Sequence, residues 1–412
     1  MPPSNTSDHE TPPIPGTLVS RERSQVIRTR LAKLLGTNKA FPGSQPVSFA
    51  HKHIQTLKEK DYYVCEKSDG IRFLMYITKD PSRPDKPTVY LIDRKPSYYH
   101  ISNLIYPIPT DVSGKAMHTE TVLDGELILD RFPDGKKQLK FLVFDCLACD
   151  GKLYMNRPLD KRIGVFMVNI IIPLQQFMRK FPKSVSTFPF LTEGKKMERS
   201  YGIEMLFRDI IPSLHHGNDG LIFTCVETPY ITGTDVNLLK WKPKTINTLD
   251  FMLRLEFIEV DEQGNVDFDA KPQFQLGVFH GRNSYSYFAD MYVDEEEWEK
   301  LKSYNTPLQD RIIECSLDEE NRWRFLRFRD DKSEANHIST VESVLKSIED
   351  AVSEEDLLRE AYAIKQAYNQ RHPKPPNNDK KRKADEDAVQ DEKVKSERKE
   401  TASGLKQNFH QD

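Results

Sequence analysis

The spacing of apolar residues divides the chain into helical and strand-like segments. In residues 24–36 apolar side chains recur every three or four positions and the pattern stops at Gly36, which predicts an amphipathic helix. Residues 160–180 and 200–214 also have helical spacing. From residue 62 onwards, short apolar runs predict strands: YYVCEK, IRFLMYIT, TVYLIDR, VLDGELIL, LKFLVFDCL, DGLIFTCV and LLKWK. This mixture predicts an α+β domain with largely antiparallel sheets over residues 21–244.

A second, smaller domain is expected over residues 245–335. It holds five strand-like segments, which suit a closed barrel of the OB type: LDFMLRLEFIEV, FQLGVFH, ADMYV, IIECSLD and NRWRFLRFR. A helical segment is predicted over residues 336–370. Residues 1–20 and 371–412 contain few core-forming side chains and are expected to be disordered.

Composition narrows the possible classes of function. The 412 residues include 60 basic and 63 acidic side chains, so the net charge is only −3. This balance argues against a protein coated for nucleic-acid binding but allows a local basic groove. The five cysteines are odd in number and lie mostly in apolar runs, which predicts reduced thiols in an intracellular protein; the lone Cys146-x-x-Cys149 pair does not predict zinc. The polar, proline-rich start and the absence of a long apolar run predict a soluble protein.

The segment YVCEKSDGIRFLMYI carries the first candidate for chemistry. Its Asp69–Gly70 pair, flanked by strand-like residues, is the usual signal for a tight β-hairpin turn, so Lys67 could be a solvated lysine at a strand end. It could also be a nucleophile, because a lysine held at a rigid bend near other charges can attack an electrophile. The four residues KSDG alone do not decide between these readings.

Strand alternation places two lysines on one face. In LLKWK, Lys240 and Lys242 point the same way and Trp241 points opposite. Two such lysines repel each other unless an anion lies between them, so they indicate either a phosphate site or a solvated edge strand.

Further candidates lie on the neighbouring predicted strands. Asp124 and Glu126 share a face, and they are either turn or surface acids or oxygen ligands for magnesium. Phe144 is either a core residue or a platform on which a base stacks. Arg94 is either a solvated strand end or a clamp for a phosphate or ribose.

The order of these motifs is more specific than any of them alone. The series KSDGIR, LIDRK, DGELI, FLVFD, DGLIF, LLKWKP and WRFLRFRDDKSEANH resembles the signature of the covalent nucleotidyltransferases: DNA ligases, RNA ligases and mRNA capping enzymes. The segments FPGSQPVSF and VETPYITGTDVNLLKWKP look like the fungal form of the eukaryotic mRNA guanylyltransferases, the alpha subunit of capping enzyme. The resemblance covers roughly residues 40–340. It implies the ATP-grasp-like fold of ligases and capping enzymes with an OB domain behind it.

The resemblance also implies a reaction and its residues. Lys67 would attack the α-phosphate of GTP, expel pyrophosphate and form a lysyl-N-GMP intermediate, which is then passed to the 5′-diphosphate end of RNA with magnesium or manganese as the cation. Arg72 and Arg94 would contact the sugar and phosphates. Glu126 would contact the ribose and the metal, and Phe144 and Ile222 would contact the two faces of guanine. Asp219 would lie near the metal and phosphates, and Lys240 and Lys242 would bind the α-phosphate. When the OB domain closes, its residues Arg329, Asp331 and Lys332 would engage the β and γ phosphates.

A polar contact that selects guanine is expected between residues 190 and 200. Lys195 and Lys196 are the candidates in that segment, and neither is assigned.

The expected partners also follow from the resemblance. They are an RNA 5′-triphosphatase, the beta subunit of a hetero-oligomer, and the phosphorylated C-terminal repeat of RNA polymerase II. KKRK at residues 380–383 is either a nuclear localisation signal or an ordinary solvated charge run, and a nuclear protein is expected. Two alternatives stay open: an ATP-dependent polynucleotide ligase, and a non-catalytic OB-fold scaffold that binds nucleic acid.

Overall fold

The computed structural model describes residues 11–80, 83–243, 248–258, 265–268, 270–304, 306–318, 320–350 and 352–373. The chain divides after Lys365 into two compact units, and the fold below belongs to the first of them. Among the described residues, none of the helices is long and apolar enough to cross a membrane. The KKRK motif and most of the tail expected to be disordered lie outside the described residues.

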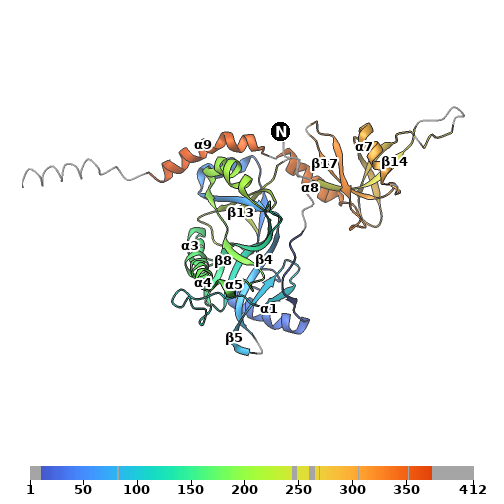
Figure 1. The fold of residues 1–412 in the computed structure, drawn as a ribbon. Helices are drawn as coiled ribbons and strands as arrows, with labels where there is room; N and C mark the ends of the chain where they lie inside the picture. The colour runs from blue at the N-terminus through green and yellow to red at the C-terminus, as the bar shows by residue number, and fades with distance from the viewer. Residues whose placement is uncertain are drawn as a thin grey trace, which may run out of the picture. The chain divides into compact units, whose positions relative to one another are not determined.

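The larger sheet of the first domain includes β4, β5 and β8 (Figure 1) and carries the motifs LIDRK, DGELI and FLVFD. Among the described residues, β10 pairs with β8 in parallel and the other neighbours in the sheet run antiparallel. The strands in spatial order are β1 (Thr17–Leu18), β6 (Tyr98–Ile101), β5 (Arg83–Ile92), β4 (Ile71–Asp80), β7 (Thr121–Arg131), β8 (Lys137–Cys149) and β10 (Leu191–Gly194), with β9 (Lys152–Leu153) paired to β8.

Both faces of this sheet are covered, which explains why its strands are apolar at successive positions. Phe73 and Met75 of β4 pack into a core with the helical segment α3 (Leu159–Phe166), the π-helix η1 (Met167–Ile171) and α4 (Ile172–Lys180). Leu74 and Tyr76 of the same strand face the other way. They pack under α1 (Arg21–Leu35). The short helix α5 (Pro182–Val185) follows α4.

Helix α1 confirms the helix predicted to end at Gly36. Ser20 accepts a hydrogen bond from the Arg23 N–H at the N-terminus, and Gly36 caps the C-terminus at φ +65°, a conformation that favours glycine. Residues 1–20 were expected to be disordered, but residues 17 and 18 form the strand β1. They are ordered because they pair with β6, which satisfies their backbone groups at the sheet edge.

The smaller sheet of the first domain presents the predicted lysines. Its strands are β11 (Glu198–Arg199), β3 (Tyr62–Ser68), β12 (Asn218–Cys225), β13 (Gly233–Trp241) and β2 (Ser44–Ser48), of which β2 runs parallel to β13. Its core also includes residues of α2 (Lys52–Glu59) and of the helical turns η2 (Ser200–Gly202), α6 (Ile203–Met205), η3 (Leu206–Ile210) and η4 (Ile211–Ser213).

The KSDG bend is not a β-hairpin. Strand β3 pairs with β11 and β12, whereas β4 pairs with β5 and β7, so the chain crosses from one sheet to the other at Asp69 and Gly70. A Cβ at Gly70 would lie 2.5 Å from the carbonyl oxygen of Leu127, which explains the glycine at this crossing. The hairpin expectation was therefore wrong in its pairing, although the bend itself lies where it was predicted.

The second domain is the expected OB barrel. Its strands are β14 (Thr248–Glu256), β15 (Gln273–Phe279), β16 (Tyr285–Asp290), β17 (Ile312–Leu317) and β18 (Trp323–Phe328), with α7 (Glu295–Ser303) between the third and fourth. They are ordered β16-β15-β14-β17-β18, and a bridge between Met291 and Trp323 links the two ends of this order. The third strand was predicted at residues 289–293, but it begins at Tyr285 and ends at Asp290. Its exposed residues are Ser286, Tyr287 and Asp290, which do not alternate with buried ones, so β16 lacks the regular apolar pattern of a half-buried strand.

The predicted C-terminal helical run forms two helices. Val341 of α8 (Ile338–Glu349) belongs to the OB core, whereas Leu357 and Ile364 of α9 (Glu354–Arg371) belong to the core of the smaller sheet. Ser353 and Asp356 exchange hydrogen bonds between side chain and backbone and cap α9, which ends the continuity of the run.

Candidate active site

A cavity is lined by residues of both sheets of the first domain. Six of the residues proposed from the sequence line it: Lys67, Arg72, Arg94, Glu126, Phe144 and Ile222. Its other lining residues include Ser44, Cys65, Asp124, Asp145, Arg162, Lys195, Met197, Thr224 and Tyr230.

Asp219 joins two of the proposed lysines. Its two carboxylate oxygens accept from Lys67 Nζ at 2.6 Å and from Lys242 Nζ at 2.7 Å. Asp219 reaches them because β12 is irregular between Asn218 and Leu221. Gly220 within this irregularity has φ +144°, and a Cβ there would lie 2.0 Å from the Trp241 carbonyl oxygen. The backbone therefore fixes Asp219 between Lys67, the candidate nucleophile, and Lys242, a candidate ligand of the phosphate.

Lys240 adds a further positive charge to this group. It is the cross-strand neighbour of Ile222, which in turn faces Cys65 on β3. Burial, followed by the charges of Lys242, Lys67 and Arg94, lowers the pKa of Lys240. A cluster of cations that repel one another in this way favours an anion.

Phe144 and Ile222 supply apolar walls from different sheets. Phe144 lies on β8 of the larger sheet and Ile222 on β12 of the smaller one, and both line the cavity. Such walls suit a flat aromatic base, for which stacking contacts are favourable. Phe144 also lies under the Arg72 guanidinium, whose Cζ is 5.4 Å from the ring centroid.

The structure separates the two candidates in the 190–200 segment. Lys195 is buried, lines the cavity and contacts Glu66 at 3.2 Å and the Ser68 hydroxyl, whereas Lys196 is exposed. Burial disfavours the charge of Lys195, but Glu66, Cys65 and Glu126 together outweigh it and raise the pKa of Lys195. Lys195 therefore braces the residues on either side of Lys67.

Glu66 also belongs to a buried network with His216 and Asp130. His216 Nδ1 lies 2.7 Å from an oxygen of Asp130, and its Nε2 lies 3.7 Å from Glu66. Burial opposes the imidazolium, yet the hydrogen bond to Asp130 and the proximity of Glu66 raise the pKa of His216.

The three residues proposed from the OB domain form a separate cluster around Asp250. Asp250 accepts from Arg329 Nη1 at 2.8 Å and from Lys332 Nζ, and Arg329 also holds both oxygens of Asp331 at 2.9 Å. The hydrogen bonds to Asp331 lower the pKa of that carboxyl to about 2. These side chains are not part of the cavity lining.

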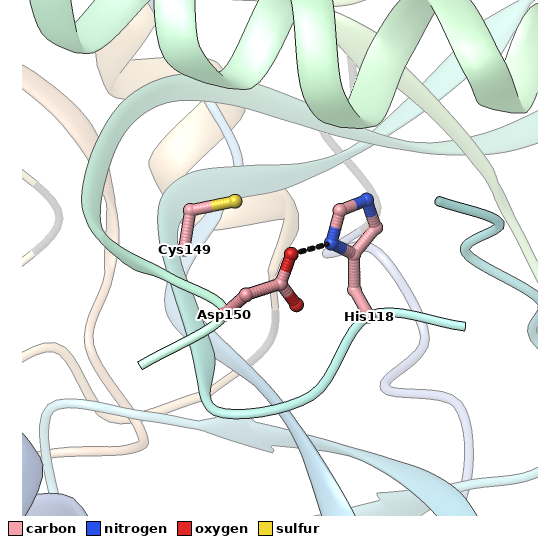
Figure 2. A group of neighbouring side chains, drawn as sticks. All are labelled: His118, Cys149 and Asp150. Carbon is pink, nitrogen blue, oxygen red and sulfur yellow. Dashed lines mark hydrogen bonds and ion pairs between the residues drawn. The ribbon is translucent and has the colours of Figure 1, made fainter. Parts of the chain in front are cut away.

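Figure 2 shows a group of His118, Cys149 and Asp150, none of which lines the cavity. His118 Nδ1 is 2.9 Å from Asp150, and its Nε2 is 2.8 Å from the carbonyl oxygen of Asn169. Because both ring nitrogens already have partners, neither is open to a metal ion. The group ties the loop before β7 to the π-helix η1.

Several cavity residues were not proposed as sites from the sequence. They include Asp124, Asp145 and Arg162. Asp124 forms a buried bidentate pair with Arg72, which was proposed, and Asp145 forms another with Arg162. Asp124 was considered as a turn, surface or metal-binding acid. Arg162 lay in a predicted amphipathic helix and gave no signal, although a charged residue on the buried stripe of that helix needs a partner.

The two sheets, the cation cluster beside a lysine and the OB domain define a nucleotidyltransferase of the covalent type. The family model "mRNA capping enzyme, catalytic domain" matches residues 9–244, and "mRNA capping enzyme, C-terminal domain" matches residues 246–358. The chain therefore belongs to the mRNA capping enzyme family, which confirms the resemblance read from its motifs.

Curated relatives support this membership over most of the chain. The mRNA-capping enzyme subunit alpha of Schizosaccharomyces pombe is 61% identical over 365 residues, which cover 88% of this chain and 90% of that protein. The Neurospora crassa subunit alpha is 48% identical over 376 residues, covering 86% and 92%. Among solved structures, a mycobacterial DNA ligase D is 13% identical with a TM-score of 0.35, over 70% of this chain and 95% of that one, which is too low to inform function.

Proposed function

We propose that this protein is an mRNA guanylyltransferase that forms a covalent GMP adduct on Lys67 and passes the GMP to the 5′-diphosphate end of RNA. The observation that carries this proposal is the position of Lys67. It is the second-last residue of β3, just before the chain crosses from one sheet to the other, and its amino group lies in a cluster of cations beside the apolar walls of the cavity. An anionic nucleotide with a flat base matches both features.

The covalent step needs little besides position and charge. The Lys67 ammonium first loses a proton to solvent, and the neutral nitrogen then attacks the α-phosphorus. As the N–P bond forms, the nitrogen loses a second proton, and the bond from the α-phosphorus to the oxygen that bridges to the β-phosphate breaks with its electron pair on pyrophosphate. Lys240 and Lys242 would stabilise the charge that develops on the α-phosphate oxygens. Asp219, which accepts from Lys67 and Lys242, holds both side chains toward the same point before GTP arrives.

A divalent cation fits the oxygen donors of the cavity. Magnesium or manganese binds few protein carboxylates and prefers substrate phosphates and water for the rest. Glu126 lines the cavity and Asp219 is partly exposed, so both could hold such an ion. When bound, the cation would neutralise phosphate charge and orient the triphosphate.

The OB cluster would complete the GTP site in a closed state. Arg329 and Lys332 would meet the β and γ phosphates on closure with Asp331 assisting, and reopening would admit RNA. The polynucleotide ligase considered as an alternative would use ATP. The choice of nucleotide therefore separates a guanylyltransferase from a ligase.

The test is incubation of the full chain with α-³²P-labelled GTP or ATP and magnesium. We expect a covalent band with GTP alone, removed by pyrophosphate. Lys67→Ala should lose the band, and Lys196→Ala, which changes an exposed lysine, should keep it. Labelling by ATP alone, or labelling of Lys67→Ala, would contradict the proposal.

The designation of the relatives as subunit alpha supports a partner chain. We propose that the partner is an RNA 5′-triphosphatase, that the phosphorylated repeat of RNA polymerase II recruits the enzyme, and that KKRK directs it to the nucleus. Copurification with each partner and the location of a protein with KKRK replaced by alanines test these proposals.

A further inference from the structure

Tyr230 has a buried hydroxyl group at the edge of the cavity. Its side chain lines the cavity, and the residue is 7% exposed. The hydroxyl donates to Asp124 Oδ2 and accepts from the backbone N–H of Ser44 at 2.9 Å and from Arg72 Nη2 at 3.4 Å. Four different elements therefore meet at one oxygen atom: the loop after β12 and the strands β2, β4 and β7.

The partners of this hydroxyl are also the partners of Arg72. Arg72 donates from Nε to Asp124 Oδ1 at 2.9 Å, from Nη2 to Asp124 Oδ2 at 2.5 Å, and from Nη1 to the Ser44 carbonyl oxygen. Tyr230 and Arg72 thus bind the same carboxylate oxygen, and they bind Ser44 through its N–H and its C=O respectively. The hydroxyl closes a ring of hydrogen bonds around the guanidinium.

Arg72 still has capacity for a ligand within this ring. A guanidinium has five N–H donors, of which Nη1 and Nη2 each carry two. One N–H of Nη1 is left over after the bond to Ser44, and the side chain lines the cavity. The rings of Phe41 and Phe144 lie 5.8 and 5.4 Å from its Cζ, so packing limits its tilt.

Tyr230 also lies next to the second buried pair. Arg162 Cζ is 5.8 Å from the Tyr230 ring centroid, and Arg162 donates to both oxygens of Asp145. Asp145 and Asp124 face each other across β7 and β8. Two acids in direct register repel, so each needs its own arginine held in place.

We propose that Tyr230 is a positioning residue that fixes the Arg72 guanidinium toward the bound nucleotide. Without the hydroxyl, Asp124 loses a donor and Ser44 N–H loses its acceptor, so Arg72 gains alternative orientations. This inference rests on the proposed function, because it assigns Arg72 to the nucleotide.

The experiment compares Tyr230→Phe with Tyr98→Phe. Tyr98 is 2% exposed, belongs to the same core cluster as Tyr230, and its hydroxyl has no hydrogen-bond partner among the described residues, so it controls for loss of a buried hydroxyl. We measure KM for GTP and the rate at saturation in the formation of the GMP adduct. Tyr230→Phe is expected to raise KM about tenfold, as for loss of a hydrogen bond to a charged group, and Tyr98→Phe to leave it within about twofold.

Repeating the Tyr230→Phe substitution in an Arg72→Lys variant separates positioning of Arg72 from a general structural role of Tyr230. In Arg72→Lys, the fork that Tyr230 orients is gone, so adding Tyr230→Phe should change KM less than about twofold. All variants are compared below their melting temperatures, which keeps loss of fold out of the result. An equal effect of Tyr230→Phe on both backgrounds, or no effect on either, would overturn the inference while wild-type labelling by GTP still supports the proposed function. Absence of labelling in the wild type refutes the proposed function and this inference with it.

Discussion

Two acids in this protein each bridge two cations, and they do so in different surroundings. Asp219 joins Lys67 and Lys242 in the first domain, and Asp250 joins Arg329 and Lys332 in the OB domain. The Asp219 side chain is 22% exposed and its lysines 26% and 31%, whereas the Asp250 side chain is only 6% exposed. Asp250 is also fixed by its backbone, which exchanges hydrogen bonds with Asn336.

The difference in burial indicates different roles for the same contact. Water and phosphate oxygens can replace Asp219 at its lysines at little cost, because an exposed ion pair is weak. That suits a lysine that must leave its partner to attack. A buried carboxylate such as Asp250 cannot release its cations without leaving a charge unpaired. It therefore serves to hold Arg329 and Lys332 as a fixed pair.

The largest effect is expected from Arg329→Ala. If Arg329 meets the triphosphate on closure, its loss should reduce formation of the GMP adduct by at least about a hundredfold, as for loss of a donor to a developing charge. Arg327→Ala, two residues earlier on β18, is the control, because its side chain is 66% exposed and bound to Glu314. Equal labelling by Arg329→Ala and wild type in a radiolabel assay would remove the OB cluster from the reaction.

Comparing Asp250→Asn with Asp219→Asn tests the two bridging acids directly. Asp250→Asn should lower the free energy of unfolding by about 3 kcal/mol, since it leaves two cations without their buried partner. Asp219→Asn should cost about 1 kcal/mol or less, because its lysines reach solvent. Urea unfolding followed by tryptophan fluorescence reports on both domains, because Trp298 and Trp323 are buried in the OB core and Trp241 is buried in the core of the smaller sheet that carries Asp219. A larger loss for Asp219→Asn would reverse the assignment of roles.

A smaller loss of stability is expected from substitution of Trp241, the residue between Lys240 and Lys242. Trp241 lies between Lys240 and Lys242 and donates from its indole nitrogen to the Val352 carbonyl oxygen at 2.8 Å, which links β13 to the segment before α9. Trp241→Phe removes that hydrogen bond and some buried area and should cost about 2 kcal/mol in thermal unfolding. Trp241→Phe with unchanged stability would show that this link is not stabilising.

The smallest effect is a dependence on pH. The pKa of His216 is raised above its ordinary 6.5 by Asp130 and Glu66 despite burial, so its charged form stabilises the fold fully below pH 6.5. That stabilisation is lost as the pH rises through the raised value. The difference in Tm between wild type and His216→Gln should therefore shrink from about pH 6 to about pH 9. A difference that grows over this range would mean that His216 is neutral in the folded protein.

Local pattern predicted much of the fold. The helix ending at Gly36, the strands around the motifs and the OB barrel all follow from periodicity and turn residues. Pairing between distant segments did not follow. That β2 runs parallel to β13, or that β3 and β4 lie in different sheets, depends on long-range packing that alternation within a strand does not report.

In the site, too, local motifs predicted some residues, whereas those that depend on distant partners were missed. The ordered motifs pointed to cations and acids that line one cavity, such as Lys67 and Glu126, and to Asp219, which contacts Lys67. The residues that hold those groups were missed. Asp250 and Arg162 lie outside the quoted motifs, Tyr230 lies in a quoted segment but was given no role there, and all three gain their roles only from partners remote in the chain. Burial of a charged residue is the signal for them, and burial is known only once the chain is folded.

The central claim is that Lys67 is the residue that carries GMP. The most direct measurement is proteolysis of the GTP-labelled protein and identification of the modified peptide by mass spectrometry. The account predicts GMP on Lys67 alone. GMP on Lys240, Lys242 or Lys195 would contradict it.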